Sequence, residues 1–146
     1  MSDSASPPPW EPPLAGTDAE QVLGSIERMR ATFRWKADGL DANGLAHRVG
    51  RSELTLGSLL KHLALVEDHY FTNLFAGHGY PTVWGELGQD GTPDWEFRTA
   101  SNDSPVVLYD LYDSAVVRSR TALAEVLARG GMDQRVDLGR PEWQPS

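Results

Sequence analysis

Apolar residues recur every three or four positions in three segments of the chain, 18–37, 56–76 and 105–129. This spacing predicts three long amphipathic helices. The run LGSLLKHLALVEDHYFTNLF in the second segment is free of proline, and it is the clearest of the three. The predicted inner faces consist of Val22, Ile26, Met29 and Phe33; of Leu56, Leu59, Leu60, Leu63, Val66, Tyr70 and Leu74; and of Leu108, Leu111, Tyr112, Ala115, Ser119, Ala122, Leu123 and Val126.

Residues that favour helix ends flank each segment. Thr17 and Thr55 are suitable N-caps, and Asp103 or Ser104 precedes a proline at the first helical position of the third segment. Gly39 and Gly77 follow the first two segments at C-terminal capping positions. The fold class is therefore predicted to be all-α, with a long crossover between the second and third helices.

The segments outside these helices predict one domain with two irregular ends. Residues 1–16 hold five prolines around Trp10, so they form a free tail, an arm held on the domain by Trp10, or a proline-rich recognition segment. Residues 77–104 have no periodicity but carry aromatic residues, which predicts an ordered crossover over one end of the bundle. The helical domain is expected over 17–132, and 133–146 are expected to be an irregular tail.

Composition narrows the classes of function. The 146 residues carry a formal net charge of −8, which is unlike a nucleic-acid-binding protein. No cysteine is present, so disulfides, thiolate metal sites and cysteine nucleophiles are excluded. No apolar stretch is long enough for a membrane span and no signal peptide is recognised, so a cytoplasmic protein without a membrane partner is expected.

Two histidines lie on the second predicted helix. His62 and His69 point in similar directions but lie about 10 Å apart along a regular helix axis. One metal ion cannot bind both at ligand distance. His62 is at the edge of the apolar stripe, so it is either a ligand directed into a cavity or a boundary histidine with one polar partner.

Glu67 falls within the apolar sector of the same helix. A buried carboxylate needs a partner, and Arg30 or Arg34 of the first helix could supply one. Glu67 is thus part of a structural ion pair, or it is a catalytic base or a residue associated with a metal. No nucleophile elbow, phosphate-binding loop or dinucleotide fingerprint occurs in the chain.

The order of three segments resembles a known family. The strings PPWEPPLAGTDAEQVLGSIERMRATFRWKADGL, LTLGSLLKHLALVEDHYF and PDWEFRTASNDSPVVLYDLYDSAVVRSR are similar to the actinobacterial branch of the DinB-like superfamily, which includes mycothiol- and bacillithiol-dependent S-transferases. The resemblance implies an up-down four-helix bundle with a divalent metal, zinc or nickel, in a cleft at one end.

In this family, one metal ligand is a histidine within L-L-x-H-L, which here implies His62 as a metal ligand. The other ligands come from a fourth helix, as His or Glu followed four residues later by His, and this sequence holds no such pair. We therefore expect a bundle truncated before its fourth helix and inactive as the isolated chain.

The resemblance also implies a mechanism and partners. The metal would hold a low-molecular-weight thiol such as mycothiol as its thiolate, and the thiolate would attack a small electrophile. Trp84 and Trp95 would belong to a lid, and Glu67, His69 and Arg30 would lie in or behind the cleft. The alternative is a non-catalytic binding or dimerisation module, or a truncated remnant, whose uncovered inner face takes a partner helix or a second copy of the chain.

Overall fold

The computed structural model describes residues 17–48 and 50–130, and in these ranges the chain is helical, with no strand. An isolated antiparallel bridge joins Arg48 to Thr55. The prediction of an all-α fold is confirmed. The described residues form two units, 17–38 and 39–130.

The first unit contains α1, Asp18–Ala37. The Thr17 hydroxyl accepts a hydrogen bond from the Glu20 amide at 3.2 Å, which satisfies one of the free donors of the first turn. Within this helix Met29 is 72% exposed, whereas Arg30 is 7% exposed. Val22, also expected on the inner face, is 41% exposed. The expected places of Met29 and Val22 on the inner face are therefore wrong.

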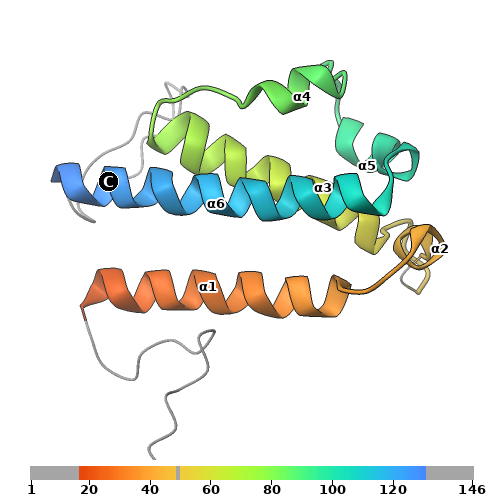
Figure 1. Cartoon of the computed structure of the whole chain (residues 1–146), viewed down its shortest axis with the longest axis horizontal. Helices are drawn as coiled ribbons and strands as arrows, with labels where there is room; N and C mark the ends of the chain where they lie inside the picture. The colour runs from red at the N-terminus through yellow and green to blue at the C-terminus, as the bar shows by residue number, and fades with distance from the viewer. Residues whose placement is uncertain (1–16, 49, 131–146) are drawn as a thin grey trace, which may run out of the picture. The chain divides into compact units, whose positions relative to one another are not determined.

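The second unit is built on two long helical segments, α3 (Leu56–Glu67), continued by η1 (Asp68–Phe75), and α6 (Pro105–Gly130). They run side by side (Figure 1). Short elements complete the unit: α2 (Ala42–Ala46), α4 (Thr82–Glu86), α5 (Trp95–Thr99) and the 3₁₀-helix η2 (Ala100–Asn102). Both α2 and α5 pack against α3.

Both long helical segments begin with the side-chain caps that the sequence predicted. Thr55 and Ser58 form a reciprocal capping box at the start of α3, with both hydrogen bonds at 3.0 Å. The Ser104 hydroxyl accepts the Val107 amide at 3.3 Å, and Pro105 occupies the first position of α6. Gly77 has φ of +73°, a conformation that glycine adopts readily after a helix end.

The second predicted helix changes type in the middle. Eight residues, from Asp68 to Phe75, form a π-helix, and the Ala76 amide bonds to the carbonyl five residues earlier, on Phe71, at 3.0 Å. A π-segment of this kind is uncommon and is associated with functional sites. Apolar spacing alone predicted one uninterrupted helix here.

The buried face of this long helix is also rotated from the predicted stripe. The buried positions are Gly57, Ser58, Leu60, Lys61, Ala64, Asp68, Thr72 and Ala76. Tyr70, which was expected on the inner face, is 43% exposed. The reason is that two charged side chains, Lys61 and Asp68, occupy the centre of the face and find partners on other elements.

The crossover 77–104 contains α4, α5 and η2, which lack the length to produce a periodic signal. Trp84 is 1% exposed and Trp95 is 4% exposed, and their rings meet edge to face at 6.4 Å. These two aromatic residues thus fix the crossover by burial, as its composition indicated.

The N-terminal arm with Trp10 and the tail 133–146 lie outside the described residues. No described helix is long and apolar enough to cross a bilayer.

Candidate functional site

His62 lies on α3 and contacts two neighbouring residues of α5. Its Nδ1 is 3.0 Å from Glu96 Oε1, and its ring stacks on Phe97 with centroids 4.6 Å apart and planes at 29°. The Glu96 side chain is 13% exposed and that of His62 is 35% exposed. The histidine is therefore held by a sheltered carboxylate while solutes can still reach it.

The position of Glu96 determines the role of each ring nitrogen. A carboxylate accepts hydrogen bonds, so Nδ1 carries the proton and donates it to Glu96. In the neutral ring Nε2 is then an acceptor with a lone pair. Within residues 17–48 and 50–130, Nε2 has no hydrogen-bond partner. This is the arrangement in which a histidine accepts a proton or binds a metal.

The residue before His62 holds α5 against α3. Lys61 is 1% exposed, and its ammonium donates to Asp103 Oδ2 at 2.6 Å and to Thr99 Oγ1 at 2.8 Å. Its Nζ also lies 4.3 Å from the centroid of the Trp95 ring, a cation–π distance. Since Thr99 and Trp95 are the two ends of α5, Lys61 fixes the helix that presents Glu96 to His62.

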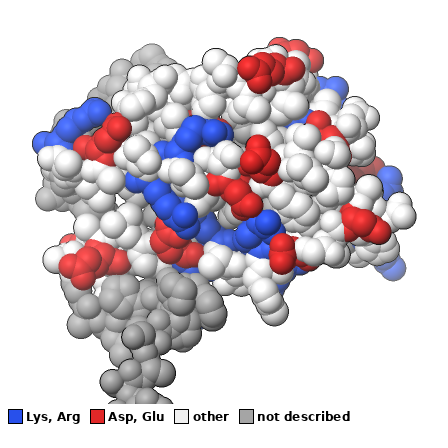
Figure 2. All heavy atoms as spheres, in the orientation of Figure 1, with Lys and Arg blue, Asp and Glu red and all other residues white. Residues whose placement is uncertain are grey.

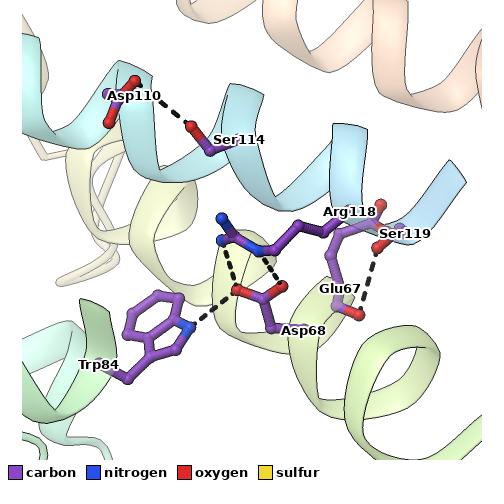
Figure 3. Close-up of polar contacts among 7 residues, drawn as sticks. All are labelled: Glu67, Asp68, Trp84, Asp110, Ser114, Arg118 and Ser119. Carbon is purple, nitrogen blue, oxygen red and sulfur yellow. Dashed lines mark hydrogen bonds and ion pairs between the residues drawn. The ribbon is translucent and has the colours of Figure 1, made fainter. Parts of the chain in front are cut away.

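A second buried charge joins the π-helix to α6 and α4. Asp68 is fully buried and accepts three hydrogen bonds, from Arg118 Nε at 2.9 Å, Arg118 Nη2 at 2.8 Å and Trp84 Nε1 at 2.8 Å. Figure 3 shows the guanidinium and the indole on two sides of this carboxylate. The bidentate geometry and the third donor satisfy a charge that would otherwise be costly to bury.

The structure also gives contacts for the other predicted site residues. Glu67 is half-buried, and its backbone carbonyl accepts from Ser119 Oγ at 3.3 Å (Figure 3). Trp84 and Trp95 pack inside the unit beside Asp68 and Lys61. Arg30, within the first unit, bonds to Glu27 Oε1 at 3.1 Å. The roles of these residues in a cleft or lid stay predictions.

His69 and His78 each contact a polar side chain of a later segment of the chain. His69 Nδ1 contacts the hydroxyl of Tyr80, just before α4, and His78 Nε2 is 2.7 Å from Glu125 Oε2 of α6. Partial burial raises the pKa of Tyr80 above 10.0, because the phenolate loses hydration there. The His78 side chain is 49% exposed.

A metal ion at His62 would need further protein ligands. A catalytic zinc takes three protein ligands. In the part of the chain that the structure describes, no group of three His, Asp or Glu side chains is arranged to hold a metal. His62 has one carboxylate and one aromatic ring beside it. The described residues do not fit such a site, and metal binding by His62 stays a prediction.

Charge on the drawn surface is mixed in sign. Figure 2 shows Lys and Arg side chains among Asp and Glu side chains, and this face has no extended tract of one sign.

Sequence reasoning missed Glu96, Lys61, Asp68 and Arg118. Glu96 lies in a segment without periodicity, 34 residues from its partner. One signal was present for two of them: Lys61 and Asp68 interrupt an apolar helix at a spacing of seven, as a buried polar stripe does.

These observations describe an all-α bundle protein with a histidine oriented by a carboxylate at the contact of α3 and α5. The family model of Mycothiol-S-transferase matches residues 21–145, and the chain belongs to this family. Neither a curated protein nor a solved structure matches the chain.

Proposed function

We propose that this protein transfers a low-molecular-weight thiol of the mycothiol type to a small electrophile, with His62 as the group that accepts the thiol proton. The family membership supports the thiol. The observation that carries the role of His62 is the 3.0 Å contact between Nδ1 and Glu96, which directs the lone pair to Nε2.

The reaction needs one proton transfer and one bond formation at sulfur. The S–H proton moves to His62 Nε2, and Glu96 stabilises the imidazolium that results. The thiolate then forms a carbon–sulfur bond with the electrophile. In an addition the proton returns from Nε2 to the product, and in a displacement the leaving group departs with the bonding electron pair.

The test is the rate of conjugation of mycothiol with chlorodinitrobenzene. His62→Asn is expected to lower kcat/KM by about 10²–10⁴-fold, the usual contribution of a positioned base. Glu96→Ala is expected to lower it by about 10–100-fold, as for other groups that orient a histidine. His47→Asn is the matched control, since His47 is an exposed histidine on the C-cap of α2.

Three outcomes distinguish the alternatives. Equal rates for His62→Asn and His47→Asn contradict the role of His62. No transfer by the folded wild type favours the non-catalytic binding or dimerisation module. Zinc or nickel retained by the wild type and lost from His62→Asn supports the metal-ligand role, which rests on the resemblance alone.

The expected homodimer rests on the uncovered inner face, and the expected cytoplasmic location rests on the sequence, in which neither a membrane span nor a signal peptide is recognised. Sedimentation velocity tests the homodimer, because a monomer at all concentrations contradicts it. Cell fractionation tests the location.

A further inference from the structure

A cavity of about 620 Å³ lies within the second unit, beside the candidate site. One side is formed by α2, the loop after it and the first turn of α3, and the other by α5, η2 and the start of α6. This volume is in the range of sites for small organic molecules. The cavity could therefore hold one whole small substrate.

Part of the cavity lining is apolar and still accessible. Leu54 is 41% exposed, and Pro93 and Phe97 also keep accessible surface. A ligand that covers these side chains removes apolar surface from water on both sides of the contact, which favours binding. This part of the lining therefore favours a molecule with a mainly apolar body.

The charges around the cavity balance. Arg48 and Arg98 carry positive charge, Glu53 and Asp94 carry negative charge, and all four are exposed. The remaining acidic lining residue, Asp103, is neutralised by Lys61 at 2.6 Å. A charged ligand gains no net attraction from such a lining, so the cavity favours an uncharged one.

The cavity and the histidine share a wall. Phe97 lines the cavity, and the same ring stacks on His62 at 4.6 Å between centroids. A ligand in the cavity thus lies one aromatic ring from the group that would activate the thiol.

We propose that this cavity binds the electrophile as a small, uncharged, mainly apolar molecule. The assignment to the electrophile rests on the proposed function, whereas binding itself does not. The cavity would place the acceptor beside Phe97, and the thiol would approach His62 from solvent.

The test uses an unreactive probe, dinitrobenzene, and its anionic analogue dinitrobenzoate. Ligand-observed NMR gives the affinity, and the ring proton signals of His62 report the location because they sense the Phe97 ring. We expect dinitrobenzene to bind at least tenfold more tightly than dinitrobenzoate and to shift the His62 signals. Ser101→Trp or Ala46→Trp, which fill the cavity from two different sides, should each weaken binding at least tenfold.

Thr121→Trp is the control, because Thr121 is exposed on α6 and is not a lining residue. Thermal unfolding of each variant verifies that it folds, and two lining variants keep the test valid if one does not. Absence of dinitrobenzene binding, tighter binding of dinitrobenzoate, or equal affinity in lining and control variants overturns the inference. Probe binding together with full transfer activity of His62→Asn supports the cavity and overturns only the proposed function.

Discussion

Lys61 Nζ and Asp103 Oδ2 lie 2.6 Å apart, in an ion pair whose lysine is 1% exposed. The pair joins α3 to the residue that precedes the N-cap of α6, and Thr99 adds a contact to α5. Three elements thus meet at one ammonium group, directly beside His62.

Replacing Lys61 tests how much this ion pair contributes to the free energy of unfolding. Lys61→Met keeps the aliphatic stem but leaves Asp103 without its cation, so we expect the free energy of unfolding to fall by about 3 kcal/mol. Urea denaturation measures it. Lys36→Met is the matched control, since Lys36 is exposed on α1 and should change stability by less than about 0.5 kcal/mol. A loss of unfolding free energy no larger than that of the control contradicts this contribution.

Asp68 should be equally important for the packing of the π-helix. Asp68→Asn removes the charge that Arg118 pairs with, and we expect a loss of about 3 kcal/mol, the low end for a buried pair because Arg118 is 31% exposed. Asp110→Asn is the control, because Asp110 is exposed and accepts a hydrogen bond from Ser114 Oγ at 3.3 Å. Similar denaturation midpoints for the two variants would count against the role of Asp68.

The protonation of the His62 ring gives a direct test of the site geometry. In the wild type, long-range proton–nitrogen NMR spectra should show neutral His62 with its proton on Nδ1, because Glu96 accepts there. Glu96→Ala should shift the ring toward the tautomer mixture of a free imidazole. Glu125→Ala is the control, since it should change only His78, whose Nε2 faces Glu125. Unchanged His62 signals in Glu96→Ala contradict the assignment.

Thr72 is a buried hydroxyl whose Oγ1 has no hydrogen-bond partner in the described ranges. Thr72→Val replaces it by an apolar group of nearly the same shape, so stability should rise by about 1–3 kcal/mol. Thr121→Val, at an exposed position of α6, should have little effect. A destabilised Thr72→Val protein shows that the hydroxyl does bind a partner.

Tyr80 predicts a dependence of stability on alkaline pH. Burial raises its pKa above 10.0, so the unfolded chain loses this proton at a lower pH than the folded chain. Its contribution to stability is therefore complete below about pH 10 and is lost as pH rises through the folded pKa. Tyr80→Phe should show a smaller loss of stability between about pH 9 and pH 11 than the wild type. An equal dependence on pH in Tyr80→Phe and the wild type contradicts the prediction.

Local signals predicted the helix ends well, and long-range partners explain what was missed. Thr17, Thr55 and Pro105 act through their own turn, so their roles can be recognised from neighbouring letters. The burial of Lys61 depends on Asp103, 42 residues later, and that of Asp68 on Arg118, 50 residues later. Hydrophobic spacing counts Lys61 and Asp68 as polar, so it predicts an inner face that excludes them.

The candidate site shows the same difference between local signals and long-range partners. His62 was singled out by its place at the edge of the stripe and by the resemblance, but its partner Glu96 lies in a short helix without periodicity. Glu67 attracted attention because it interrupts the apolar sector, whereas its neighbour Asp68 is the fully buried carboxylate. A shift of one position on a helix is enough to exchange these roles, because neighbouring side chains point about 100° apart.

The burial of Lys61 also has a use in chemical labelling. Lys36 and Lys61 are the two lysines of the chain, and only Lys36 is exposed. An amine-reactive dye should therefore modify α1 at one side chain, besides the terminal amine, while the ammonium inside the bundle stays unreacted. Since the chain has no cysteine, one engineered thiol on α6 would accept a second dye without competition. Once the terminal amine is blocked, the protein is thus suited to fluorescence energy transfer between its two units with a single substitution.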